Sequence, residues 1–199
     1  MNSVLFLDID GVLNSRDFAI AQTEAGRTAE SADRVDPVAV AHLQRIIQET
    51  NCYVSVSSVW RMNNTTGIIA RILMAAGMDK QYAKRIVGLN PIVYKDVSFS
   101  KKYIEEQNTE FAKSPWSGNW YRGYESAVWL LRNRERYNIS RFAIVDDDSD
   151  MWHMVLRFVH TPNSTGLTED KANQLIQLLN TDSTEFIERL KSLVYEEHL

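Results

Sequence analysis

The stretch Val4-Leu5-Phe6-Leu7-Asp8-Ile9-Asp10-Gly11-Val12 decides the fold of this chain. Its first four residues form a short continuous apolar run, which is typical of a strand buried in a parallel sheet. Two carboxylates and a glycine follow almost at once. Because ligands of open α/β sheets bind beyond the carboxyl ends of the strands, we expect a functional site at Asp8 and Asp10.

The rest of the chain alternates between strand and helix patterns. Apolar runs predict strands at 53–58, 86–90, 142–145 and 157–160, and apolar stripes at helical spacing predict helices at 36–47, 68–77, 124–137, 175–179 and 182–193. This order predicts an α/β fold, a doubly wound, mainly parallel five-stranded sheet with helices on both faces. We expect one domain over residues 1–199, in which 14–35 is polar and aperiodic and 92–121 is an irregular insertion.

The composition excludes several classes of protein. The 199 residues include 26 acidic side chains against 22 Lys and Arg, and a net charge of −4 gives no overall basic field for coating nucleic acid. The single cysteine, Cys52, excludes a disulfide framework and a thiolate metal cage and favours a reducing compartment. No run approaches the ~20 apolar residues that span a bilayer. We therefore expect a cytoplasmic protein with no membrane association and no obligate protein partner.

Polar side chains at the ends of other predicted strands complete the candidate site. Ser57 and Ser58 end the second strand, and Asp146 and Asp147 follow the fourth. Converging carboxylates repel one another unless a cation or a shared proton relieves them, and Mg²⁺, which prefers oxygen ligands, is the natural cation. A phosphate monoester suits such a site. A carboxylate is the nucleophile, a serine hydroxyl donates to a phosphoryl oxygen, and a Lys or Arg compensates charge.

These residues also carry a resemblance to a known family. Segment 8–12 resembles the first motif of the haloacid dehalogenase (HAD) superfamily, Asp-x-Asp-x-(Thr/Val), and Ser57, Arg122 and Asp146-Asp147 follow in the order of its later motifs. Segments 57–61, 88–91, 122–125, 146–151 and 166–168 resemble a HAD subgroup associated with RNA-repair proteins. The resemblance implies a HAD-like (Rossmann-like) sheet. Residues 14–35 and 92–121 are too short for a large cap domain, so we expect a minimal cap domain or none. The resemblance also implies a Mg²⁺-dependent phosphatase whose phosphorylated substrate is a DNA or RNA end.

The resemblance implies roles for the acidic residues. Asp8 would attack phosphorus to form an aspartyl-phosphate, and Asp10 would protonate the leaving oxygen and later activate water. Asp146 would join Asp8 and the backbone carbonyl of Asp10 around Mg²⁺. Asp147 would orient Asp8 or a metal-bound water, and Asp150 is the alternative for this second acidic position.

The basic and hydroxyl residues have alternatives as well, and for Arg122 and Arg61 these include a surface charge or a structural ion pair. Ser57 would hold a phosphoryl oxygen, with Ser58 in reserve. Arg122 would neutralise charge where most of the superfamily has a lysine, and a lysine of the insertion is the alternative. The alternatives are Lys95, Lys101 and Lys102; the predicted substrate contacts are Ser58, Arg61, Lys101, Lys102 and Trp120.

Other interpretations of the pattern stay open. One is a phosphatase of nucleotides or other small phosphorylated metabolites, and another is a non-catalytic module that keeps the fold and the metal. Asp8 and Asp10 at a strand end are also compatible with a plain turn at Gly11. A receiver domain has similar residues in a different order, because its acidic pair comes first and its basic residue last.

Overall fold

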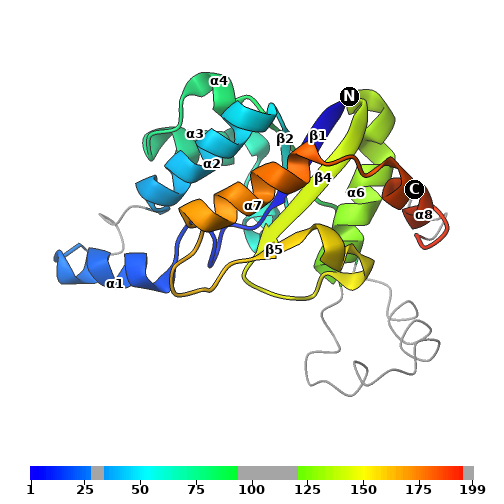
Figure 1. Ribbon diagram of the computed structural model, residues 1–199. Coiled ribbons are helices and arrows are strands. Elements are labelled where there is room, and N and C mark those ends of the chain that lie inside the picture. The colour runs from blue at the N-terminus through cyan, green and yellow to red at the C-terminus, as the bar shows by residue number, and fades with distance from the viewer. Residues whose placement is uncertain (28–33, 94–120, 195–199) are drawn as a thin grey trace, which may run out of the picture.

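Five parallel strands form one sheet in the order β3-β2-β1-β4-β5 in the computed structural model, which describes residues 1–27, 34–93 and 121–194 (Figure 1). The strands are β1 (Asn2–Leu7), β2 (Tyr53–Val56), β3 (Ile86–Leu89), β4 (Ile139–Asp146) and β5 (Phe158–His160). The predicted five-stranded parallel sheet is therefore confirmed. The central strand β1 lies between β2 and β4, so the motif that follows it emerges in the middle of the sheet.

The α-helices are α1 (Arg16–Glu24), α2 (Pro37–Thr50), α3 (Thr66–Ala75), α4 (Lys80–Ala83), α6 (Tyr121–Tyr137), α7 (Glu169–Asn180) and α8 (Thr184–Leu190). Among the described residues, the short 3₁₀ helix η1 (Val59–Met62) directly follows β2. Another, η3 (Trp152–Arg157), directly precedes β5. None of the helices in the described ranges is long and apolar enough to cross a membrane.

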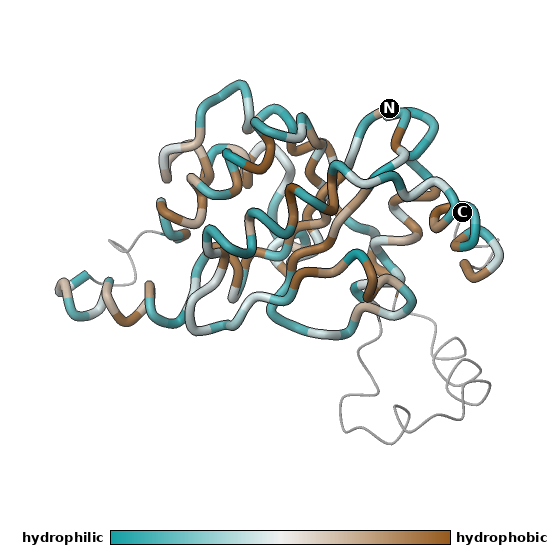
Figure 2. The backbone as a smooth tube through the Cα atoms, viewed as in Figure 1, coloured by the Kyte–Doolittle hydropathy of each residue, from teal (hydrophilic) through white to brown (hydrophobic). Residues whose placement is uncertain are grey.

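Alternate residues of β1 face two separate hydrophobic cores. Leu5 and Leu7 pack with α2, α3 and α7 in one core, whereas Val4 and Phe6 pack with α6 and α8 in the other. All four side chains are completely buried, and each contributes about 1.5–3 kcal/mol of transfer free energy. Figure 2 shows the hydrophobic residues gathered along the central strands and the inner sides of the helices. The sheet is therefore covered on both faces, as predicted.

The helix α1 corrects the expectation that residues 14–35 lack regular structure. Ser15 caps its first turn by accepting a hydrogen bond from the amide of Phe18 at 3.3 Å, and Asp17 in that turn favours the helix N-terminus. No residue of α1 is buried, and the helix extends away from the sheet (Figure 1). An exposed helix needs no apolar stripe, so its sequence shows no helical periodicity.

The helix α6 begins at Tyr121, three residues before the predicted start. Gly123 lies in its first turn, and a glycine in a helix counts against a helix prediction. A Cβ on Gly123 would lie 2.2 Å from the backbone oxygen of Met151, so only glycine lets α6 approach the loop after β4. The early start places Arg122 on a helix. Of the predicted insertion at 92–121, residues 94–120 lie outside the described part of the chain.

Candidate active site

The registers of three strands, β2, β1 and β4, bring the predicted polar residues into one row. Leu7 pairs with Val56 on one side and with Val145 on the other, so the next residues, Ser57, Asp8 and Asp146, lie level with one another. Backbone bonds continue the alignment past the strands. The amide of Ser57 donates to the Leu7 carbonyl at 2.8 Å, and the amide of Asp8 donates to the Val145 carbonyl at 3.0 Å.

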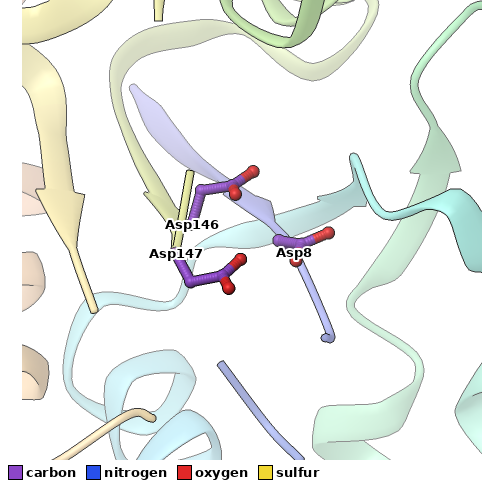
Figure 3. Close-up of side chains that lie close together, drawn as sticks. All are labelled: Asp8, Asp146 and Asp147. Atoms are coloured by element: carbon purple, nitrogen blue, oxygen red, sulfur yellow. The ribbon is translucent and has the colours of Figure 1, made fainter. Parts of the chain in front are cut away.

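Three carboxylates converge at this edge of the sheet (Figure 3). Asp8, Asp146 and Asp147 each offer an oxygen, and these oxygens lie within 4.8 Å of one another. Asp8 and Asp146 are buried, and Oδ2 of Asp8 has no hydrogen-bond partner among the described residues. A set of hard oxygen donors with an unsatisfied member fits a hard divalent cation such as Mg²⁺. The sequence predicted Asp8, Asp146 and the backbone carbonyl of Asp10 as ligands. The carboxylate of Asp10 is not in this cluster, and Asp147 is.

Arg122 reaches the cluster from the first turn of α6. Its Nη1 lies 2.7 Å from Oδ1 of Asp8 and 2.9 Å from Oδ2 of Asp146. The three lysine alternatives for this position lie in the part of the chain that the structure does not describe. Burial by itself lowers the pKa of Arg122, but Asp8 and Asp146 outweigh it and raise the pKa above its ordinary value. The guanidinium therefore stays charged beside the carboxylates.

The pKa values of the carboxylates in and beside the cluster are raised above their ordinary values. Burial raises the pKa of Asp8, although the charge of Arg122 opposes the rise. Burial and then repulsion from Asp8 raise the pKa of Asp146. Asp150, the alternative acidic residue, has a pKa raised to about 7 by burial and by repulsion from Asp148. One guanidinium therefore compensates this acidic cluster only partly, and a further cation would favour its ionised form.

Asp10 faces a different set of neighbours. The indole Nε1 of Trp60 lies 3.0 Å from both carboxylate oxygens, and the side-chain amide of Asn14 donates to Oδ1 at 2.8 Å. Asn14 also accepts a hydrogen bond from the amide of Gly11 at 3.1 Å, so the turn after β1 orients the Asp10 side chain.

Gly11 also lets the turn approach Asp147. Its φ of +70° is left-handed, and a Cβ there would lie 2.2 Å from Oδ2 of Asp147. The side-chain amide of Asn163 donates to the same oxygen at 2.8 Å. Asp147 is therefore held between the turn after β1 and the loop after β5.

The two adjacent serines differ in their surroundings. The hydroxyl of Ser57 is buried and has no hydrogen-bond partner among the described residues. Ser58, also buried, caps η1, where its Oγ accepts from the amide of Trp60 at 3.3 Å. A buried polar atom without a partner is costly, so the Ser57 hydroxyl is the better donor for a ligand.

Arg61, a predicted substrate contact, lies in a buried ion pair. Its guanidinium pairs with the carboxylate of Glu125 on α6 and donates to the carbonyls of Ser57 and Ser58. Glu125 also accepts a hydrogen bond from the amide of Val93 at 3.3 Å. The pair therefore joins α6 and the residue Val93 after β3 to the segment Ser57-Ser58, called the serine loop below. The predicted contacts Lys101, Lys102 and Trp120 lie outside the described residues.

A second polar chain supports Arg122, and sequence analysis gave its residues no role. Asn90 accepts from the hydroxyl of Ser55 at 2.8 Å and donates to the hydroxyl of Ser126 at 2.9 Å. Ser126 in turn donates to the Arg122 carbonyl at 2.8 Å. The sequence signal that could have indicated Asn90 is its position directly after β3, level with Ser57 after β2.

Comparison with known proteins gives one family. A family model described as the HAD domain in Swiss Army Knife RNA repair proteins matches residues 4–172. No curated protein and no solved structure matches. The matched range contains β2 to β5, all of β1 except its first two residues, and every residue of the site described above.

Proposed function

Because the chain belongs to the family of HAD domains in Swiss Army Knife RNA repair proteins, we propose that it is a Mg²⁺-dependent phosphatase of nucleic-acid ends. The single observation that carries the proposal is Oδ2 of Asp8. This oxygen is buried, has no hydrogen-bond partner among the described residues, and belongs to a carboxylate clustered with Asp146 and Asp147. A carboxylate oxygen in such surroundings is suited to bind a cation or to attack an electrophile.

In the proposed reaction, an oxygen of Asp8 attacks phosphorus. The bond from phosphorus to the leaving oxygen breaks, and an aspartyl-phosphate forms on Asp8. Asp10 gives a proton to the leaving oxygen, so the product leaves as an alcohol. Asp10 then takes a proton from a water molecule that attacks phosphorus, and inorganic phosphate leaves with Asp8 restored. Trp60 and Asn14 hold Asp10 in position for both proton transfers.

Charge in the transferring group is compensated by the residues around Asp8. Arg122, which touches both Asp8 and Asp146, would attract the phosphoryl oxygens, and the Ser57 hydroxyl would donate to one of them. Mg²⁺ held by Asp8, Asp146 and Asp147, with the Asp10 carbonyl as the further predicted ligand, would screen the nucleophile from the phosphate.

The substrate class rests on the family rather than on the geometry. The family is named for RNA repair proteins, and the proposal takes the ends of a broken strand as the phosphate groups that such repair would process. A phosphatase of nucleotides or other small metabolites would use the same carboxylates, so substrate preference must be measured directly.

The first experiment measures hydrolysis of an aryl phosphate with and without Mg²⁺. We expect Mg²⁺-dependent turnover that Asp8→Asn lowers about a thousandfold or more, because the nucleophile is lost. Asp17→Asn changes an exposed aspartate of α1 and is the matched control. Activity that persists in Asp8→Asn would refute the assignment of the nucleophile.

The second experiment compares a 3′-phosphorylated oligonucleotide, a 5′-phosphorylated one and free nucleotides at equal concentration. A clear preference for either oligonucleotide supports the role in end processing. Faster turnover of the free nucleotides would assign the enzyme to small metabolites.

A further inference from the structure

The side chain of Trp60 borders the carboxylate of Asp10. Its Nε1 lies 3.0 Å from both oxygens, and its backbone is fixed by the Ser58 cap and by a 2.9 Å hydrogen bond from Asn64 to its carbonyl. In the proposed reaction Asp10 protonates the leaving oxygen. The leaving group therefore comes to lie close to Trp60.

Arg34 extends this border with a positive charge. Its guanidinium carbon lies 4.6 Å from the centroid of the Trp60 ring. Arg34 is exposed, and within the described ranges no carboxylate lies at ion-pair distance from it. A guanidinium that stacks on an aromatic ring keeps its N–H edges available for a phosphate.

Apolar side chains of η1 lie in the same region of the chain. Val59 and Met62, on either side of Trp60 in the sequence, are 49% and 46% exposed. Exposed apolar groups beside a polar site are suited to contact the flat face of a base or a sugar. Next to Asp10 there is thus an anchored aromatic ring with a cation stacked on it, and the residues adjoining Trp60 in the sequence include exposed apolar side chains.

We propose that Trp60 and Arg34 form the subsite for the leaving group, in which Arg34 binds the internal phosphodiester of the nucleotide that loses its terminal phosphate. The inference rests on the proposed function. A terminal nucleotide carries the scissile phosphate on one sugar oxygen and a phosphodiester on the other. Asp10 protonates the first oxygen as it leaves. Arg34, stacked on the neighbouring indole, binds the phosphodiester that the second oxygen carries. The leaving group that this subsite binds is the terminal nucleotide of a strand, rather than a free nucleoside.

The test uses the full chain with two substrates that share a terminal nucleoside. One is a 3′-phosphorylated or 5′-phosphorylated oligonucleotide, whichever the enzyme prefers, and the other is the nucleoside monophosphate with no internal phosphodiester. We expect Arg34→Ala to lower the ratio of kcat/KM for the oligonucleotide to that for the monophosphate about tenfold or more, because a charge-assisted hydrogen bond is lost. Arg34→Lys should restore part of the ratio, since it keeps the charge without the planar fork.

Salt dependence separates a phosphate contact from a structural effect. For the oligonucleotide, the slope of log kcat/KM against log salt concentration should become shallower in Arg34→Ala by about 1, the change expected when one phosphate contact is lost. Arg16→Ala, which changes an exposed arginine of α1, is the matched control and should keep both the ratio and the slope. An unchanged ratio in Arg34→Ala, or an equal loss on both substrates, would overturn the subsite.

Binding to a non-hydrolysing protein separates this inference from the proposed function. In Asp8→Asn, we expect the further change Arg34→Ala to weaken binding of the oligonucleotide about tenfold in fluorescence anisotropy. If the wild-type chain hydrolyses the aryl phosphate with Mg²⁺ but Arg34→Ala leaves the binding unchanged, the subsite fails and the phosphatase stands. If Arg34 supports binding and no phosphate ester is hydrolysed, the proposed reaction fails and Arg34 is a nucleic-acid contact only.

Discussion

Ser57 and Ser58 are neighbours in the chain, but their hydroxyl groups have opposite surroundings. The Ser57 hydroxyl is buried without a partner in the described chain, whereas the Ser58 hydroxyl caps η1. An unpartnered buried hydroxyl lowers stability unless a ligand accepts its hydrogen bond. In the proposed function the two residues therefore have different tasks, because Ser57 donates to the substrate and Ser58 caps η1.

This assignment gives a prediction for the two alanine variants. Ser57→Ala should lower kcat about a hundredfold, because a donor to the transferring phosphoryl group is lost, and should leave the thermal midpoint unchanged or raise it. Ser58→Ala should instead lower the free energy of unfolding by about 1 kcal/mol, because a helix cap is lost. Steady-state kinetics and thermal unfolding of both variants check this. The reverse pattern would move the phosphate contact to Ser58.

At the same scale, some assignments followed from the sequence and others required contacts. Asp8 and Asp146 were predictable because both directly follow apolar runs, and such runs end at a common sheet edge. The partner of Arg61 was not predictable, because Glu125 is distant in the sequence and only the packing of α6 brings the two together. Arg61, in a conspicuous motif, was therefore predicted to contact substrate with a structural ion pair as the alternative, and the partner of that ion pair could not be named.

At the scale of elements, the ion pair between Arg61 and Glu125 joins η1 and the serine loop to α6. The side chains are only 6% and 1% exposed. Burial raises the pKa of Glu125 to about 7, although the attraction of Arg61 opposes the rise. Desolvation thus outweighs attraction, so the pair specifies how the elements meet more than it stabilises the chain.

One single variant and one double variant test this view of the ion pair. Glu125→Gln should lower the free energy of unfolding by about 3 kcal/mol, since it leaves the charge of Arg61 buried and unpaired. Replacing both residues, Arg61→Met with Glu125→Leu, should recover most of that loss but lower kcat, because the serine loop loses its tie to α6. Urea unfolding at about pH 8, where the carboxylate is ionised, and kinetics on the aryl phosphate measure the two effects. A double variant with full activity would exclude a positioning role.

The elements that the sequence missed share a physical cause. The five strands and the helices of both cores bury apolar residues, and burial gives them periodic patterns. The helix α1 buries nothing, and the first turn of α6 contains Gly123, which the contact with Met151 requires. Pattern analysis finds elements that pack by apolar faces and overlooks those fixed by caps or by close backbone approach.

At the scale of the whole molecule, the acidic cluster links folding to protons and to metal. The pKa values of Asp8, Asp146 and Asp150 are raised in the folded chain, first of all by burial. Between about pH 4 and about pH 8 the folded protein therefore binds more protons than the unfolded chain. The stability that this proton binding contributes is fully present below the unfolded pKa and is lost as the pH rises through the folded pKa.

We therefore expect the thermal midpoint of the metal-free protein to fall from about pH 5 to about pH 8, and Mg²⁺ to raise it more at the higher pH. In the proposed function Mg²⁺ binds the ionised carboxylates, so it should restore the stability that deprotonation removes. Scanning fluorimetry with a chelator and with saturating Mg²⁺ measures both effects. Asp146→Asn should flatten the pH dependence and reduce the effect of Mg²⁺, whereas Asp17→Asn should change neither. An effect of Mg²⁺ that is equal at both pH values would place its binding outside this cluster.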